Sequence, residues 1–118
     1  MIFELDLKNT ILSAAVGKKG NFAAAVKDSG SASTLKVFRK NQKELCSRTF
    51  NDEKITDIDL SDDGRYAVVG TISSKDAQIN SKVYVLKFDS EGFISTFDFK
   101  NCAVVSVKYD GSHNISVI

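Results

Sequence analysis

The chain has 118 residues and a formal net charge of +1 at pH 7; 42% of its residues are hydrophobic and 26% are charged. This length fits one domain, and the composition excludes a disordered chain. The near-neutral charge argues against a nucleic-acid partner. Because no apolar run approaches the roughly 18–20 residues of a membrane span, and no basic region opens the chain as in a signal peptide, we expect no membrane insertion by this segment.

Short segments in which apolar and polar residues alternate follow one another along the whole chain, and this alternation is typical of β-strands. It predicts strands over residues 11–17, 22–28, 34–40, 44–50, 55–61, 66–73, 81–88 and 93–100, with further strands over 102–109 and 113–118. Turn signals rich in Gly, Asn and Asp separate the segments. The sequence therefore predicts an all-β antiparallel protein, with the following residues buried: Ile58, Leu60, Ala67, Val69, Val83 and Val85.

The first part of this pattern recurs 44 residues later, as Ile11-x-x-Ala14-x-Val16-x-x-x-Gly20-x-Phe22 and then Ile55-x-x-Ile58-x-Leu60-x-x-x-Gly64-x-Tyr66. A third partial copy begins at Cys102, which is 47 residues after Ile55. The second halves of the first two copies match when four residues are inserted within 71–81. A four-stranded unit with this period is typical of a β-propeller blade. A β-sandwich or barrel with similar strands is the alternative.

We expect the units to divide the chain into the last strand of a preceding blade (1–10), two full blades (11–54 and 55–101) and a partial blade (102–118). Closed propellers have about four to eight blades. Two blades and parts of two others leave apolar faces and edge strands uncovered. We therefore expect either a fragment of a longer protein or self-association, through blade faces or through the terminal strands 2–6 and 113–118.

One turn carries a family resemblance. Leu60-Ser61-Asp62-Asp63-Gly64-Arg65-Tyr66 resembles the turn between the first two strands of many propeller blades, except that Asp62 stands where proline is usual. The pattern is similar to quinoprotein-like or TolB-like blades rather than to WD repeats, whose Trp-Asp and Gly-His pairs do not occur at matching positions. The whole chain resembles an uncharacterised, membrane-anchored propeller family of gut Clostridia. This resemblance implies the extracytoplasmic side of a bacterial membrane, with the anchor outside this chain.

No set of residues has the pattern of a catalytic, metal or cofactor site. The loop 17–20 has glycines at both ends, but a strand follows it instead of the helix that a phosphate loop needs, so we expect a hairpin turn. The acidic cluster Asp57, Asp59, Asp62 and Asp63 lacks the closing glutamate of a calcium loop, and we interpret it as a solvated strand face followed by a turn. We therefore expect no metal and no cofactor.

His113 has no recognisable nucleophile or acid partner and occupies the position of Phe22 and Tyr66 in the repeat, so we expect a half-buried structural role. The glycosylation sequon at Asn114 lies inside a predicted strand. Four aromatic residues are expected to pack between blades rather than to stack on a ligand: Tyr66, Tyr84, Phe97 and Phe99. Cys46 and Cys102 are expected to be small buried hydrophobes with free thiols, a disulfide between them being the alternative.

These observations predict a non-catalytic binding or scaffolding module whose partner is a protein or a glycan. The alternatives are an accessory propeller segment of a larger enzyme and an architectural spacer of a membrane-anchored surface protein. The expected partner contact is the long loop Ser73–Ser81, which carries Lys75, Asp76, Gln78 and Asn80, because loops adapt most easily to a ligand.

Overall fold

The computed structural model describes residues 11–17, 20–27, 32–41, 43–62, 64–75, 78–88, 93–104, 106–109 and 115–118. The regular secondary structure within these ranges consists of β-strands alone. The strands are β1 (Ile11–Val16), β2 (Phe22–Lys27), β3 (Ser33–Phe38), β4 (Glu44–Phe50), β5 (Lys54–Leu60), β6 (Tyr66–Lys75), β7 (Gln78–Lys87), β8 (Phe93–Lys100), β9 (Val107–Tyr109) and β10 (Ile115–Val117). The prediction of an all-β protein is confirmed. The strand expected at residues 2–6 lies outside the described residues.

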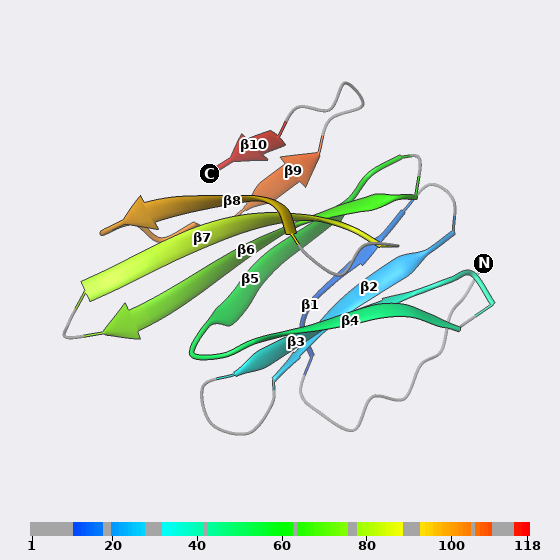
Figure 1. Ribbon diagram of the computed structural model, residues 1–118, viewed down its shortest axis with the longest axis horizontal. Coiled ribbons are helices and arrows are strands. Elements are labelled where there is room, and N and C mark those ends of the chain that lie inside the picture. Colours follow the sequence, from blue (N-terminus) through cyan, green and yellow to red (C-terminus); the bar gives the residue numbers. More distant parts are fainter. Residues whose placement is uncertain are drawn as a thin grey trace.

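The strands form two four-stranded antiparallel sheets in simple chain order, β1-β2-β3-β4 and β5-β6-β7-β8, and a separate hairpin of β9 and β10. In Figure 1 the two sheets spread out next to each other, and the β9–β10 hairpin lies beyond β8 at the top of the view. The first strands of successive units are neighbours, because β1 contacts β5 and β5 contacts β9. The predicted pair of four-stranded antiparallel sheets is therefore present.

The two sheets share their local irregularities as well as their strand order. The pairing register shifts between Ile11 and Ser13 and between Val37 and Phe38 in the first sheet, and between Ile55 and Asp57 and between Val85 and Leu86 in the second. Each shift is a bulge-like step that bends one strand and increases the local twist. The same two strand pairs are therefore bent at matching places in both sheets.

The main core lies between the two sheets. Leu35 and Val37 of the first sheet pack in one buried cluster with Val69 and Leu86 of the second. These residues meet because side chains alternate between the two faces of a strand, and these four lie on the faces that the two sheets turn toward each other. All six residues predicted to be buried are buried: Ile58, Leu60, Ala67, Val69, Val83 and Val85.

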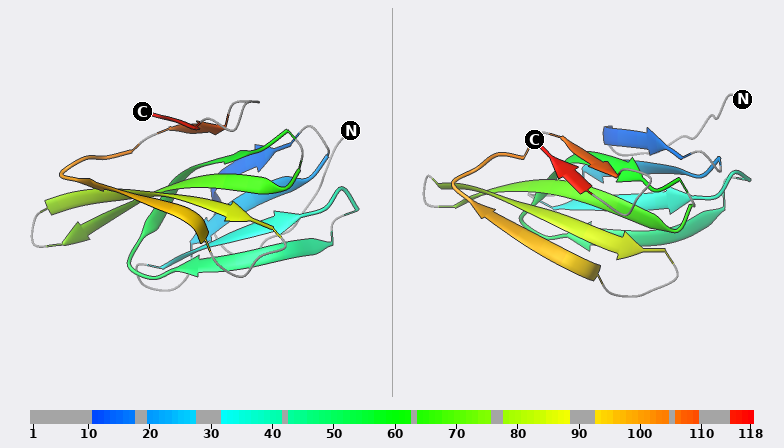
Figure 2. Two further views of the ribbon diagram at one scale, coloured as in Figure 1. Left: turned by 45° about the horizontal axis from the view of Figure 1, so that its top comes forward. Right: turned by 90° about the horizontal axis from the view of Figure 1, so that it is seen from above.

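A second cluster covers the opposite face of the second sheet. Val83 and Val85 pack there with Val104 and Val107, which precede and open β9. Gly70 permits this close approach, since a Cβ atom at its position would lie 3.2 Å from a Val107 methyl carbon. Figure 2 shows the β9–β10 hairpin standing next to the β5–β8 sheet as a third layer. The second sheet therefore packs on both faces, which explains why β7 is apolar at consecutive positions.

The expected long loop over residues 73–81 is wrong, because most of it is strand. The pairing of β6 with β7 continues through Ser73–Asn80 and Ser74–Ile79 to Lys75–Gln78. The four inserted residues lengthen the two strands of the hairpin together. An even number of added residues keeps the alternation of faces, so the ladder continues without interruption.

The sequence alignment of β2 with β6 is wrong by one residue. In the first sheet the turn closes with a hydrogen bond from Gly17 N to Asn21 O (2.8 Å), and in the second with one from Ser61 N to Tyr66 O (2.9 Å). The second turn is thus one residue longer, and Phe22 corresponds to Ala67 rather than to Tyr66. A slip of one residue exchanges the two faces of a strand. The sequence alignment therefore matched each side chain of β2 with a side chain on the opposite face of β6.

Candidate functional site

The connection from β4 to β5 joins the two sheets and is held by one serine hydroxyl. Ser33 Oγ donates to the carbonyl oxygen of Glu53 (2.7 Å) and accepts from the backbone N–H of Ile55 (3.2 Å). Asp52, the residue before Glu53, has a φ of 59°, a left-handed conformation that Asp tolerates better than most residues. The hydroxyl thereby satisfies two buried or partly buried backbone groups at the turn.

The same arrangement recurs where β8 leads toward β9. Ser81 Oγ donates to Cys102 O (2.8 Å) and accepts from Val104 N (2.8 Å), and Asn101 has a φ of 57°. Ile55 therefore corresponds to Val104, an offset of 49 residues instead of the 47 expected from the sequence. The hydrogen bonds of Ser33 and Ser81 to the backbone define this offset. Apolar spacing alone could not define it, because a shift of two residues leaves the alternation of apolar and polar positions unchanged.

The Glu53 side chain is the centre of a polar cluster at this junction. Tyr84 Oη lies 2.7 and 2.8 Å from the two carboxylate oxygens, and Thr71 Oγ1 donates to Oε1 at 2.7 Å. The Tyr84 ring packs against Phe50 with a centroid distance of 4.8 Å. Burial, and then the hydrogen bond to Glu53 and its negative charge, raise the pKa of Tyr84. The phenol therefore stays protonated and serves as a donor to the carboxylate.

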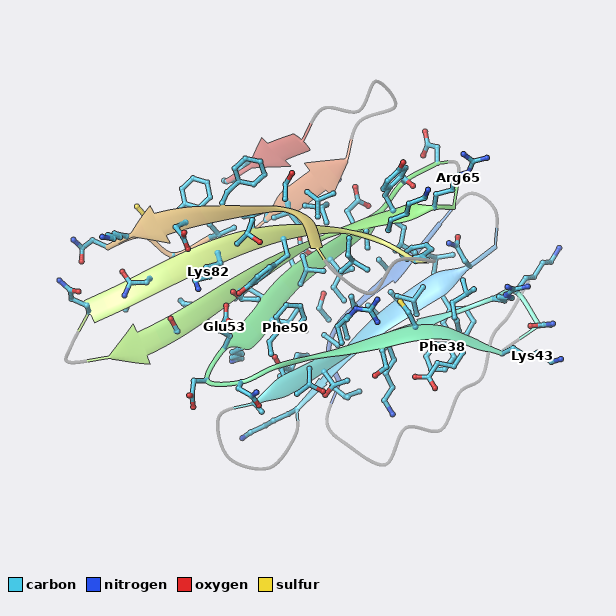
Figure 3. The ribbon with its side chains drawn as sticks, viewed as in Figure 1. Phe38, Lys43, Phe50, Glu53, Arg65 and Lys82 are labelled. Atoms are coloured by element: carbon cyan, nitrogen blue, oxygen red, sulfur yellow. The ribbon has the colours of Figure 1, made fainter. Side chains whose placement is uncertain are left out.

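An open cleft of about 1050 Å³ lies over this junction. Segments from both sheets line it: Leu12, Lys27, Ala32, Ser33, Asn51, Asp52, Glu53, Lys54, Ile72, Ser73, Ser74, Ile79 and Lys82. Figure 3 shows Glu53 and Phe50 close together where the first sheet passes into the second, with Lys82 on a neighbouring strand. The lining combines apolar side chains such as Ile79, which is 47% exposed, with the exposed Lys54 and Lys82. This mixture suits an amphipathic ligand.

The expected partner-binding segment lies partly on this cleft. Ser73, Ser74 and Ile79 are on its wall, as part of the β6–β7 hairpin rather than of a flexible loop. Asn80 has a structural contact instead, because its Oδ1 accepts from Asn101 N at 3.2 Å. Asp76 lies outside the described residues.

The acidic cluster is not a solvated face throughout. Asp57 Oδ2 accepts from the backbone N–H of Val107 at 2.9 Å and so ties β9 to β5. Next to it, Thr56 Oγ1 lies 2.9 Å from Val104 O. The prediction of full solvation failed at Asp57 because it did not place β9 against this strand. No group of three potential metal ligands occurs among the described residues, which include Asp59 and Asp62; Asp63 lies outside them.

The remaining candidates occupy different environments. Gly20 N donates to Gly17 O at 3.1 Å and β2 follows directly, so this loop is a hairpin turn as predicted. Cys46 is buried as expected, but Cys102 is exposed. Both thiols are free, and burial raises the pKa of Cys46. His113 and Asn114 lie outside the described residues.

Of the four aromatic residues expected between blades, two pack in or against a buried cluster, one is half-buried and one is exposed. Tyr84 is in the core between the sheets and Phe99 packs partly against the second cluster. Phe97 is 47% exposed, which contradicts the expected packing. Tyr66 is half-buried at the start of β6.

Three residues that organise the cleft were not predicted from the sequence, namely Ser33, Glu53 and Thr71. One signal was present: Ser33 and Ser81 stand at matching positions, two residues before Leu35 and Val83 in the repeat. A hydroxyl that recurs at the start of a buried strand indicates a recurring backbone contact. Glu53 has no matching acid in the second unit, where Cys102 takes its place, and so gave no such signal.

The described residues contain no helix that is long and apolar enough to cross a membrane. The comparison with curated proteins found no match. A family model matches residues 1–118, which is the full length of the chain. The chain, with its paired four-stranded sheets and the cleft between them, therefore belongs to the family described as "Family of unknown function (DUF5711)".

Proposed function

We propose that the chain is a non-catalytic binding module made of two successive β-propeller-type blades, and that the cleft at their junction binds a segment of a partner protein. The observation that carries this proposal is the open cleft itself, which both sheets line and which has the anchored Glu53 carboxylate in its wall. A concave site with apolar lining and a few placed polar groups is the usual form of a binding site.

The propeller interpretation is supported by the agreement between the two sheets. Both have the same meander order, matching bulges and a serine contact to the connection that follows the sheet. The first strand of each unit contacts the first strand of the next unit, because β1 contacts β5 and β5 contacts β9. Four-stranded sheets stacked through their first strands around an axis are the construction principle of a propeller.

The chemistry of the lining supports a protein segment rather than a glycan. Leu12, Ile72 and Ile79 offer apolar contacts, and Lys27 and Lys54 are exposed next to them. The described lining residues include no aromatic ring on which a sugar could stack. A peptide with an apolar anchor and flanking acidic residues complements this surface.

The geometry of Glu53 supports a binding role rather than catalysis. Its carboxylate already accepts hydrogen bonds from Tyr84 and Thr71. The Thr71 and Tyr84 hydroxyls hold the carboxylate toward β6 and β7, whereas a general base must be directed at the substrate proton that it removes. These contacts make Glu53 a fixed part of the wall, where it orients the surrounding side chains.

A photo-crosslinking amino acid at Ile79 tests the proposal in the organism that makes the protein. We expect a discrete protein adduct from position 79, and a weaker one when Lys54→Glu reverses the charge at the cleft. The matched control carries the same amino acid at Thr96, which is exposed on β8 and does not line the cleft. Equal adducts from both positions, or binding of the purified chain to an array of glycans but not of peptides, would refute the proposal.

A further inference from the structure

The hairpin of β6 and β7 extends past the beginning of the neighbouring strand β5. The ladder between β5 and β6 ends at the pair Lys54–Ile72, whereas β6 and β7 stay paired as far as Lys75–Gln78. Figure 1 shows both strands continuing beyond the start of β5 at the lower left of the view. Among the described strands, none pairs with residues 73–75 on the side of β5. This part of β6 is a free edge, with backbone groups available at alternate residues.

The connection before β5 turns away from this edge. Asp52 has a φ of 59°, and Ser33 of β3 donates to the carbonyl oxygen of Glu53 at 2.7 Å. A straight continuation of β5 would pair residues 51–53 with residues 73–75. These contacts direct the connection toward the first sheet instead. The place that a longer β5 would occupy therefore belongs to the open cleft, which residues of both segments line.

The cleft passes around this edge from one face of the second sheet to the other. Ile72, Ser73 and Ser74 are consecutive and all line the cleft, although consecutive strand side chains point to opposite faces. Lys82 and Ile79 of β7 also line it. By their register, Lys82 lies on the face toward the first sheet and Ile79 on the opposite face. The two faces of a sheet meet only at an edge, so a ligand that fills the cleft lies along the β6 backbone.

The two faces offer different chemistry to such a ligand. On the face toward the first sheet, Lys82 is exposed, and the exposed Lys27 of β2 lies across the cleft. On the opposite face, Ile72 and Ile79 offer apolar contacts. Side chains of an added strand alternate between the same two faces. Acidic residues at every second position, with apolar residues between them, therefore complement both faces at once.

The charges around the cleft also favour an acidic ligand. Three exposed lysines line it, at positions 27, 54 and 82, against two acids, at positions 52 and 53. The Glu53 carboxylate already accepts hydrogen bonds from Thr71 and Tyr84. Lys82 Nζ lies 3.9 Å from Asp98 Oδ1, and both side chains are exposed. Exposed ion pairs of this kind contribute little to stability, so an acidic ligand can compete for Lys82.

From these observations we infer that the partner segment binds as an extended strand, added to the free edge of β6 in line with β5. The inference rests on the proposed function and specifies the partner: its acidic residues meet Lys27 and Lys82, and its alternate apolar residues meet Ile72 and Ile79. Hydrogen bonds between the two backbones supply affinity, and the alternating side chains supply specificity.

Selection from a library of random peptides displayed on phage, with the purified 118-residue chain as the bait, tests the side-chain pattern. We expect the enriched peptides to carry acidic and apolar residues at alternate positions. Lys82→Glu should weaken the strongest peptide at least roughly tenfold, because it places a like charge next to the acidic residues. Lys100→Glu is the matched control, since Lys100 is exposed on β8 and does not line the cleft. Enriched peptides without this alternation would overturn the inference.

Methylation of the selected peptide at one backbone nitrogen at a time tests the strand pairing. Only alternate residues of an added strand direct their N–H groups to β6, so we expect affinity to fall at every second position. Hydrogen exchange should slow for amides within residues 73–75 of the complex, while amides of β8, at the far edge of the same sheet, keep their rates. Peptides that bind the cleft without either effect overturn this inference alone. If no peptide is enriched and Ile79 gives no crosslink, the proposed function fails as well.

Discussion

Replacing Tyr84 with phenylalanine removes one hydroxyl from the junction between the sheets and little else. The ring is 6% exposed and packs on Phe50, and phenylalanine can keep that packing. The lost group is the phenolic donor that lies 2.7 and 2.8 Å from the Glu53 carboxylate oxygens. A hydrogen bond to a charged group contributes about 1.5–3 kcal/mol. We expect the free energy of unfolding to fall by about that amount.

Urea denaturation measures this change, with an unchanged m-value as evidence that the folded and unfolded states keep their compactness. A double-mutant cycle with Glu53→Gln isolates the pairwise contribution. We expect a coupling energy of about 1 kcal/mol or more, because the two groups share one hydrogen-bond cluster. A loss below about 0.5 kcal/mol, or additive effects of the two substitutions, would contradict the role assigned to Glu53.

The pH dependence of stability gives a second measurement on the same residue. The pKa of Tyr84 is raised in the folded protein, whereas an unfolded tyrosine titrates near its ordinary value of about 10. The unfolded state therefore loses this proton first as the pH rises. The contribution is complete below pH of about 10 and is lost progressively above it. Tyr84→Phe should therefore lose less stability than the wild type as the pH rises above about 10; equal losses would refute the assignment.

Three further predictions concern the rest of the junction and the thiols. Ser33→Ala leaves two backbone groups of the β4–β5 connection without their partner, and chemical denaturation should show a loss of about 1–3 kcal/mol, with Ser47→Ala, an exposed serine of β4, as the control. Asp57→Ala removes the acceptor for Val107 N, and hydrogen exchange should show faster exchange of that amide while amides in the first sheet keep their rates. Iodoacetamide should alkylate the exposed Cys102 well before Cys46, because burial raises the pKa of the Cys46 thiol; equal rates in mass spectrometry would show that Cys46 is accessible.

The alternation of apolar and polar residues was sufficient to predict most strands of this protein. Strand boundaries over 44–50 and 93–100 agree with β4 and β8 at both ends. Alternation succeeds where one face of a strand is more deeply buried than the other, as over Ile58–Leu60 of β5, because the burial then follows the two-residue period of the strand. The recurrence of the pattern also indicates two similar four-stranded units.

Turn length and strand extension were decided only by the tertiary structure. The one-residue difference between the turns before Phe22 and Ala67 does not interrupt either apolar pattern, yet it exchanges the faces of a whole strand. The β6–β7 hairpin extends through Ser74–Ile79 although its residues are mostly polar. Backbone hydrogen bonds determine both features, and they depend on pairing rather than on side-chain polarity.

The candidate site could not be assembled from local patterns at all. Glu53 meets Thr71, 18 residues later, and Tyr84, 31 residues later, and each comes from a different strand. Taken alone, Glu53 is an ordinary charged residue in a turn. Its role arises because β6 and β7 place the hydroxyls of Thr71 and Tyr84 within hydrogen-bond distance of its carboxylate. Alternation could place residues on the faces of strands, but only the stacking of one sheet on the next brought these three side chains together.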